Sequence, residues 1–109
     1  MTASKRNSKR NTLSKEIQEI SKLYFVAMKH VNGKDVLHDS GELMDDYSRY
    51  IIRVRNAYQQ LDDLEKSIIN NEFFYEDYPN WWKKIFSRST FFRLKKQSML
   101  KFKEAFDNA

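Results

Sequence analysis

Apolar residues recur at helical spacing along most of the chain, and no segment shows the apolar–polar alternation of a strand. The first periodic stretch predicts a helix over residues 14–30, with Ser14 as its N-cap. Asn32 and Gly33 are expected to end this helix, because glycine readily adopts the left-handed conformation found at helix ends. The apolar stripe consists of Ile17, Ile20, Tyr24 (or Leu23) and Met28.

A hydrophilic loop at residues 34–41 precedes the second predicted helix. This helix is expected to begin near Ser40, whose hydroxyl can cap it, and to end near Gln60. Asp45 and Asp46 suit its first turns, where negative charge complements the helix dipole. The apolar stripe consists of Leu43, Tyr47, Tyr50, Ile51, Val54 and Tyr58.

The third predicted helix runs from Asp62 or Asp63 to about Phe73. Asp62 is followed three residues later by Glu65, and this spacing is typical of a capping box. Such a box pairs backbone N–H groups at the start of a helix, so it predicts where this helix begins. The buried face consists of Leu64, Ile68, Ile69 and Phe73.

The C-terminal part predicts a short helix, a turn and a long helix. Pro79 suits the first position of a helix that runs to about Ile85, since its missing N–H would be unpaired there anyway. Residues 86–88 are predicted to form a turn, and Ser89 to cap a fifth helix that extends to about Phe106. The apolar stripe of this last helix consists of Phe91, Leu94, Ser98, Phe102 and Ala105.

Together these elements predict an all-α fold of about five helices in a single domain over residues 14–109. Residues 14–60 would form a helical hairpin, and residues 61–106 a C-terminal helix-turn-helix unit. Residues 1–13 contain the near-repeat SKRNSKRN and nothing that can bury a core, so they are predicted to be a disordered basic arm.

The amino-acid composition favours a folded helical protein over disordered, membrane-spanning or disulfide-stabilised chains. Two Gly and one Pro favour long helices, and eight Phe, six Tyr and two Trp disfavour a disordered chain. No apolar stretch approaches the roughly 20 residues that span a bilayer, and the polar N-terminal residues do not resemble a secretory signal. The absence of cysteine excludes disulfides and thiolate metal sites. It fits the reducing cytoplasm, where we expect the protein.

Charge is segregated along the chain. Residues 1–15 carry +5 and residues 80–103 carry +8, both without an acidic residue, whereas residues 16–79 carry −6. A basic stretch interleaved with aromatic residues favours a polyanionic partner, and nucleic acid is the commonest one. The alternative explanation of the same stretch is a solvated face without a partner.

The basic stretch coincides with the predicted helix-turn-helix, in which the second helix enters the major groove of double-stranded DNA and the first crosses the backbone. Phe92 is the candidate for contact with a thymine methyl group. If six of the cations neutralise phosphates, log affinity should fall against log salt with a slope of about −5. The residues expected to contact DNA are Lys83, Lys84, Arg88, Ser89, Phe92, Arg93, Lys95 and Lys96.

The segment SRSTFFRLKKQSMLKF at residues 87–102 resembles the recognition-helix stretch of the DNA-binding C-terminal region of bacterial sigma factors. The segment LDDLEK at residues 61–66 resembles the acidic start of the helix that opens that region. The positions with matching spacing are Ser87, Thr90, Phe91, Ser98 and Phe102.

The double aromatic before RLKK is more similar to the ArpU-like phage regulators of Gram-positive bacteria, and the chain also resembles small mollicute proteins of this length. The resemblance covers roughly residues 61–106. It departs from the sigma-factor pattern at PNWW, residues 79–82, where an Ile-Ala pair and a Gly-containing turn would be usual. The resemblance implies a helix-turn-helix protein that binds DNA.

No residue pattern indicates catalysis. His30 and His38 have no metal-ligand spacing and no cysteine partner, and two glycines cannot build a phosphate-binding loop. The acidic pairs at residues 45–46 and 62–63 are explained as caps and solvated turns. We therefore expect no enzyme activity, no metal site and no cofactor.

The leading hypothesis is a DNA-binding transcriptional regulator. The alternative is a protein-interaction module, in which the acidic, aromatic-rich residues 14–60 dock onto RNA polymerase or a second copy of the chain. An exposed Tyr47, Tyr50 or Tyr58 would signal such an interface. RNA binding ranks lower, because the sequence lacks the sheet platform and the GxxG loop of the common RNA modules.

Deletion of residues 1–12 tests the basic arm. We expect the truncated protein to keep its helical fold and to bind all nucleic-acid sequences more weakly, because such an arm contacts phosphates and reads few bases. The salt slope should become shallower by up to about four, one for each lost cation in contact. Affinities of both proteins over a range of salt concentrations check this prediction. An unchanged slope would show that the arm is only a solubilising tail.

Overall fold

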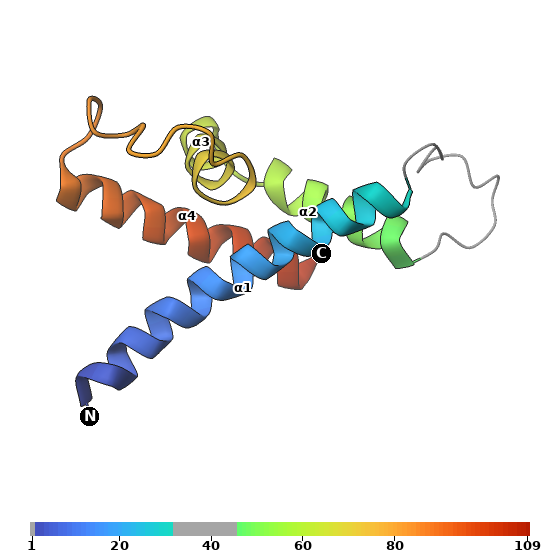
Figure 1. Cartoon of the computed structure of the whole chain (residues 1–109), viewed down its shortest axis with the longest axis horizontal. Coiled ribbons are helices and arrows are strands. Elements are labelled where there is room, and N and C mark those ends of the chain that lie inside the picture. Colours follow the sequence, from blue (N-terminus) through green and yellow to red (C-terminus); the bar gives the residue numbers. More distant parts are fainter. Residues whose placement is uncertain (1, 32–45) are drawn as a thin grey trace.

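The computed structural model describes residues 2–31 and 46–109, with the side chains of residues 12–31 and 46–109. These residues form an all-α fold without strands (Figure 1). The elements are α1 (Thr2–His30), α2 (Asp46–Gln59), α3 (Asp63–Ile69), the π-helical segment η1 (Asn70–Phe74) and α4 (Arg88–Asn108).

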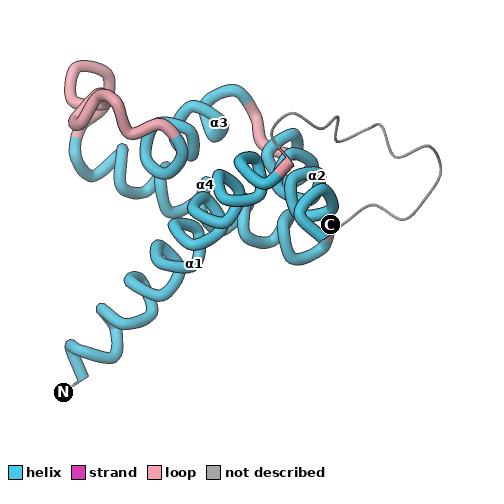
Figure 2. The backbone as a smooth tube through the Cα atoms, turned by 45° about the vertical axis from the view of Figure 1, so that its right-hand side comes forward, coloured by secondary structure: helices cyan, strands magenta, loops and turns pink. Residues whose placement is uncertain are grey.

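The core lies where α1 crosses the C-terminal half of α4, with α2 packed on both and α3 and η1 against α4 (Figures 1 and 2). Each helix contributes apolar residues three or four positions apart, so that one stripe of each faces the centre. The central cluster consists of Ile17, Ile20, Val54, Ala57, Leu61, Ile69, Phe73, Phe102 and Phe106. A smaller cluster of Ala27, Val31 and Ile51 continues it between α1 and α2.

Two polar side chains donate hydrogen bonds to backbone carbonyls near the ends of helices. The buried Ser21 Oγ of α1 donates to the carbonyl of Phe73 at 2.8 Å, which ties α1 to η1. Arg53 Nε of α2 donates to the carbonyl of Phe106 at 2.7 Å, and its guanidinium lies 4.0 Å from the centroid of the Phe106 ring. The last carbonyls of a helix lack the usual intrahelical partners, and Arg53 gives the Phe106 carbonyl a second donor beside the Ala109 N–H at 3.4 Å.

α1 begins at Thr2, whereas the sequence predicted a helix from Ser14 preceded by a disordered arm. Residues 2–13 contain no Gly or Pro, so no residue interrupts the helical hydrogen bonds as the helix extends towards the N-terminus. The expected arm is therefore a helical extension of α1 that leaves the core, as Figure 1 shows.

Residues 79–85 form successive turns and not the predicted fourth helix. Asn80 has a φ of 62°, in the left-handed region, and a right-handed helix cannot continue through such a residue. Backbone hydrogen bonds from Lys83 N–H to the Asn80 carbonyl (3.1 Å) and from Phe86 N–H to the Trp82 carbonyl (2.9 Å) close the turns. The described residues therefore form four α-helices, where the sequence predicted five for the whole chain.

The start of α4 also differs from the prediction. Its N-cap is Ser87, whose Oγ accepts a hydrogen bond from Thr90 N–H at 3.3 Å and donates one to Thr90 Oγ1 at 2.8 Å. Ser89, the predicted cap, lies inside the first turn. Arg88 is consequently the first residue of the helix.

Residues 75–87, which we call the connector, join η1 to α4. A helix-turn-helix joins its two helices through a turn of about three or four residues. The connector is much longer, so the short turn predicted at residues 86–88 does not link two helices, although α3 still packs against α4. The helix-turn-helix arrangement is thus not confirmed.

The third helix starts where the sequence predicted. Asp62 accepts from Glu65 N–H at 2.8 Å, and Glu65 Oε1 accepts from Asp62 N–H at 2.8 Å, which completes the capping box. The α-helix ends at Ile69 and continues as η1 to Phe74, close to the predicted end. The predicted cap of the second helix at Ser40 and the stop signal at residues 32–33 lie outside the described residues.

Asp62→Ala should lower the free energy of unfolding by about 1 kcal/mol, because the N–H group of Glu65 loses its partner. Asp63→Ala is the matched control: Asp63 is an exposed neighbour whose side chain forms no hydrogen bond with the described residues. Urea denaturation of both variants and the parent measures the difference. Equal losses for the two variants would contradict the role of the cap.

Candidate nucleic-acid interface

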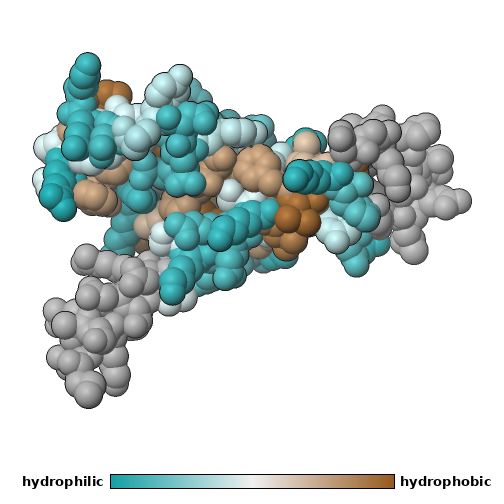
Figure 3. Space-filling model, viewed as in Figure 1, coloured by the Kyte–Doolittle hydropathy of each residue, from teal (hydrophilic) through white to brown (hydrophobic). Residues whose placement is uncertain are grey.

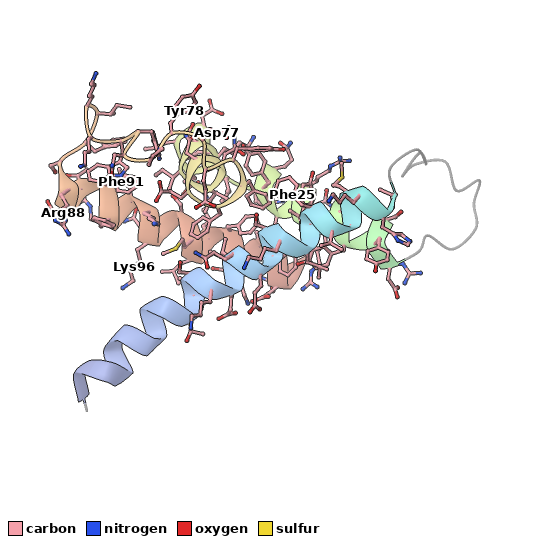
Figure 4. All side chains as sticks on the ribbon, in the orientation of Figure 1. Phe25, Asp77, Tyr78, Arg88, Phe91 and Lys96 are labelled. Carbon is pink, nitrogen blue, oxygen red and sulfur yellow. The ribbon has the colours of Figure 1, made fainter. Side chains whose placement is uncertain are left out.

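Aromatic stacking holds the connector on the first half of α4. The ring of Trp82 stacks on that of Phe91 with centroids 4.4 Å apart, and Trp81 meets the same ring edge-on at 5.8 Å. Phe91 is only 1% exposed as a result. Phe91 lies between the connector and α4 in Figure 4. The irregular backbone of residues 80–86 therefore rests on a fixed aromatic layer.

A carboxylate of η1 fixes both the connector and α4. Trp81 Nε1 donates to Glu72 Oε2 at 2.9 Å, and Lys95 Nζ donates to Glu72 Oε1 at 2.8 Å. The side chains of Lys95 and Glu72 are 22% and 17% exposed, so this pair is shielded from solvent. Lys95 Nζ also lies 5.5 Å from the centroid of the Phe73 ring. Lys95 is thus engaged within the protein, although the sequence grouped it with the DNA-contacting residues.

Two more lysines of the basic stretch form ion pairs with acidic residues of α1, α3 and α4. The hydrogen bond from Lys101 Nζ to the Glu65 carboxylate, at 2.9 Å, raises the pKa of Lys101. Hydrogen bonds from Lys103 Nζ to Asp107 (2.7 Å) and to Glu16 (3.0 Å) raise the pKa of Lys103. These lysines join α4 to α3 and to α1, so their charges serve the packing of the helices.

The remaining cations of residues 80–103 are exposed and form no ion pair within the part of the chain that the structure describes. They lie on the connector and on the first half of α4. We call them the basic tip: Lys83, Lys84, Arg88, Arg93 and Lys96.

The connector and α4 bring part of the basic tip around a shallow hollow. This hollow has a volume of about 590 Å³, and Lys83, Arg88 and Phe92 lie on its border. The Arg88 guanidinium lies 5.7 Å from the centroid of the Phe92 ring. Phe92, the aromatic residue that the sequence predicted to contact a thymine methyl group, is 46% exposed. Cations from two segments and one exposed aromatic ring thus meet on a single surface.

The outward face of α4 carries the rest of the tip. Ser89, Arg93 and Lys96 are spaced by four and three residues, so they lie along one exposed stripe of the helix. Lys96 projects from α4 on the side opposite the connector in Figure 4. Because the connector occupies the other side of α4, this stripe remains open.

The two basic segments of the sequence lie at the same end of the molecule. α1 and α4 both run from their crossing towards that end, where Thr2 and Arg88 begin the two helices (Figures 1 and 2).

The role of Glu72 was not predicted from the sequence, because its partners lie on segments that no local pattern links to η1. The His30 ring lies against the Tyr47 ring with centroids 4.0 Å apart and a tilt of 32° between the ring planes. The described residues contain no cluster of His, Cys, Asp and Glu that could hold a metal ion. Within the described ranges, no helix has the length and apolar character needed to cross a membrane.

Comparisons of the chain with protein-family models, with curated proteins and with solved structures find no significant match.

Glu72→Ala should lower the free energy of unfolding by about 2 to 3 kcal/mol, because it leaves Lys95 and the Trp81 N–H without their shared partner. Tryptophan fluorescence should shift to the red as the connector loosens. Glu76→Ala, an exposed neighbour, is the control and should change neither property. Urea titration followed by fluorescence measures both properties. Identical behaviour of the two variants would contradict the role of Glu72 as a clamp that holds the connector and α4 together.

Proposed function

We propose that this protein binds double-stranded DNA through the basic tip and acts as a transcriptional regulator. The observation that carries the proposal is how the charges of residues 80–103 divide: Lys95, Lys101 and Lys103 are paired with acids, whereas the basic tip has no acidic partner among the described residues. A concentrated set of unpaired cations repels itself, and a polyanion relieves that repulsion.

In this proposal the first half of α4 lies in the major groove, which admits an α-helix. Arg93, Lys96 and Ser89 would face base edges and the flanking phosphates, since they share the open stripe of the helix. Lys83 and Lys84 of the connector would contact one backbone strand. The exposed ring of Phe92 offers an apolar contact for a thymine methyl group.

The long connector sets this arrangement apart from the usual helix-turn-helix. In that unit the first helix crosses the DNA backbone next to a short turn. Here residues 75–87 separate η1 from α4. The connector, and not a first helix, would therefore contact the DNA backbone. The sigma-factor-like character of the protein, and with it promoter recognition, depends on the sequence resemblance alone.

The triple variant R88A/R93A/K96A tests the proposal. It should bind a duplex at least about tenfold more weakly than the parent at low salt, and the slope of log affinity against log salt should become shallower by about three. Fluorescence anisotropy with a labelled duplex over a range of salt measures both quantities.

The control for this experiment is K22A/K29A/R49A, which removes the same charge from exposed positions of α1 and α2. It should lower the affinity only slightly, because a general loss of charge acts through screened long-range attraction. Equal loss in the two triple variants, or no binding by the parent at low salt, would overturn the proposal.

A protein-interaction module is the second candidate. Tyr47, Tyr50 and Tyr58 are half-buried, so they do not provide the exposed interface that the sequence suggested. Leu23 and Val26 of α1, however, are 43% and 52% exposed, and Figure 3 shows a hydrophobic patch over the C-terminal half of α1. Absence of DNA binding together with concentration-dependent sedimentation would favour this function.

A further inference from the structure

A cavity of about 400 Å³ lies between α1, α2 and η1, with Tyr75 at the start of the connector on its border, and no residue of the basic tip lines it. Its volume falls within the range of small-molecule sites, and its walls are mostly apolar and aromatic, as is typical of such sites. The aromatic walls are Tyr24, Tyr58, Phe74 and Tyr75.

The π-helical turn shapes one wall of this cavity. The N–H of Tyr75 donates to the carbonyl of Asn70 at 2.7 Å, and this bond closes the wide turn of η1. Asn70, Phe74 and Tyr75 consequently line the same space. π-helical turns within helices are rare and frequently occur at functional sites.

Two polar groups on the border of the cavity have binding capacity to spare. Arg55 forms no ion pair within the described residues, and its Nη2 makes only a 3.7 Å contact with the sulfur of Met28. The side-chain amide of Asn70 forms no hydrogen bond with the described part of the chain. The cavity therefore offers a guanidinium group and a side-chain amide beside aromatic rings.

The hydroxyl groups of two tyrosines add to this polar border. Burial raises the pKa of Tyr58, and its proximity to Tyr75 raises it further. The Tyr58 phenol consequently stays neutral at physiological pH and can donate a hydrogen bond. Arg55 is the charged residue among those that line the cavity, and no carboxylate lines its wall.

We propose that this cavity binds a planar aromatic acid, with its ring between the tyrosine and phenylalanine walls and its carboxylate on Arg55. Aromatic rings prefer stacked or edge-on contact with other aromatic rings, which the walls supply. A guanidinium binds a carboxylate through two parallel hydrogen bonds, and the Asn70 amide can donate another. The site is separate from the DNA-binding surface, so it does not depend on the proposed function.

The test uses 2-naphthoate as the probe and its neutral analogue 2-naphthamide as the comparison. ¹H–¹⁵N NMR spectra of the full chain are recorded during titration with each compound. We expect saturable shifts at the amides of Tyr24, Asn70 and Tyr75 with 2-naphthoate, and at least about tenfold weaker binding of 2-naphthamide.

Arg55→Gln should weaken binding of 2-naphthoate by about tenfold or more, because it removes the charged guanidinium group. Arg49→Gln is the matched control on the same helix: Arg49 is exposed, pairs with Asp46 and does not line the cavity, so affinity should stay unchanged. The spectra also show that each variant is folded. No saturable binding, shifts confined to other residues, or equal affinity of the two variants would overturn the proposal.

Discussion

The carboxylate of Glu72 determines where the basic tip lies. It binds both the connector, through Trp81, and α4, through Lys95, from the end of the α3–η1 unit. The connector has no regular helix to hold it in place, so its position depends on this clamp and on the rings stacked around Phe91. Without them, the connector cations would keep no fixed distance from those of α4.

The stretch with a charge of +8 divides into two classes of cation, and the Glu72 clamp accounts for one of the paired lysines, Lys95. Lysines that face α1, α3 and η1 meet carboxylates, which neutralises the charge next to the core and joins the helices. Cations that face away from those elements meet none in the described chain. In the proposed function, the unpaired cations are the ones that meet the polyanion.

The helices followed from local signals, because apolar periodicity and caps act over a few residues. The capping box at Asp62 and the buried stripe of α4 were both predicted in this way. The fourth helix was wrong because Pro79 was read as a helix start, and the left-handed conformation of Asn80 has no sequence signal strong enough to oppose it. Of the candidate site, the exposed ring of Phe92 was predicted, whereas the pairing of Lys95 required the tertiary fold.

In our proposal the open stripe of α4 and the connector form one surface for DNA. NMR mapping tests it directly: ¹⁵N-labelled protein is titrated with a duplex at low salt, and the shifted amides are assigned. We expect the shifts to concentrate at residues 83–96 and largely to spare α2, and added salt to reverse them. Shifts centred on α2 and the C-terminal half of α1, or no shifts at low salt, would contradict it.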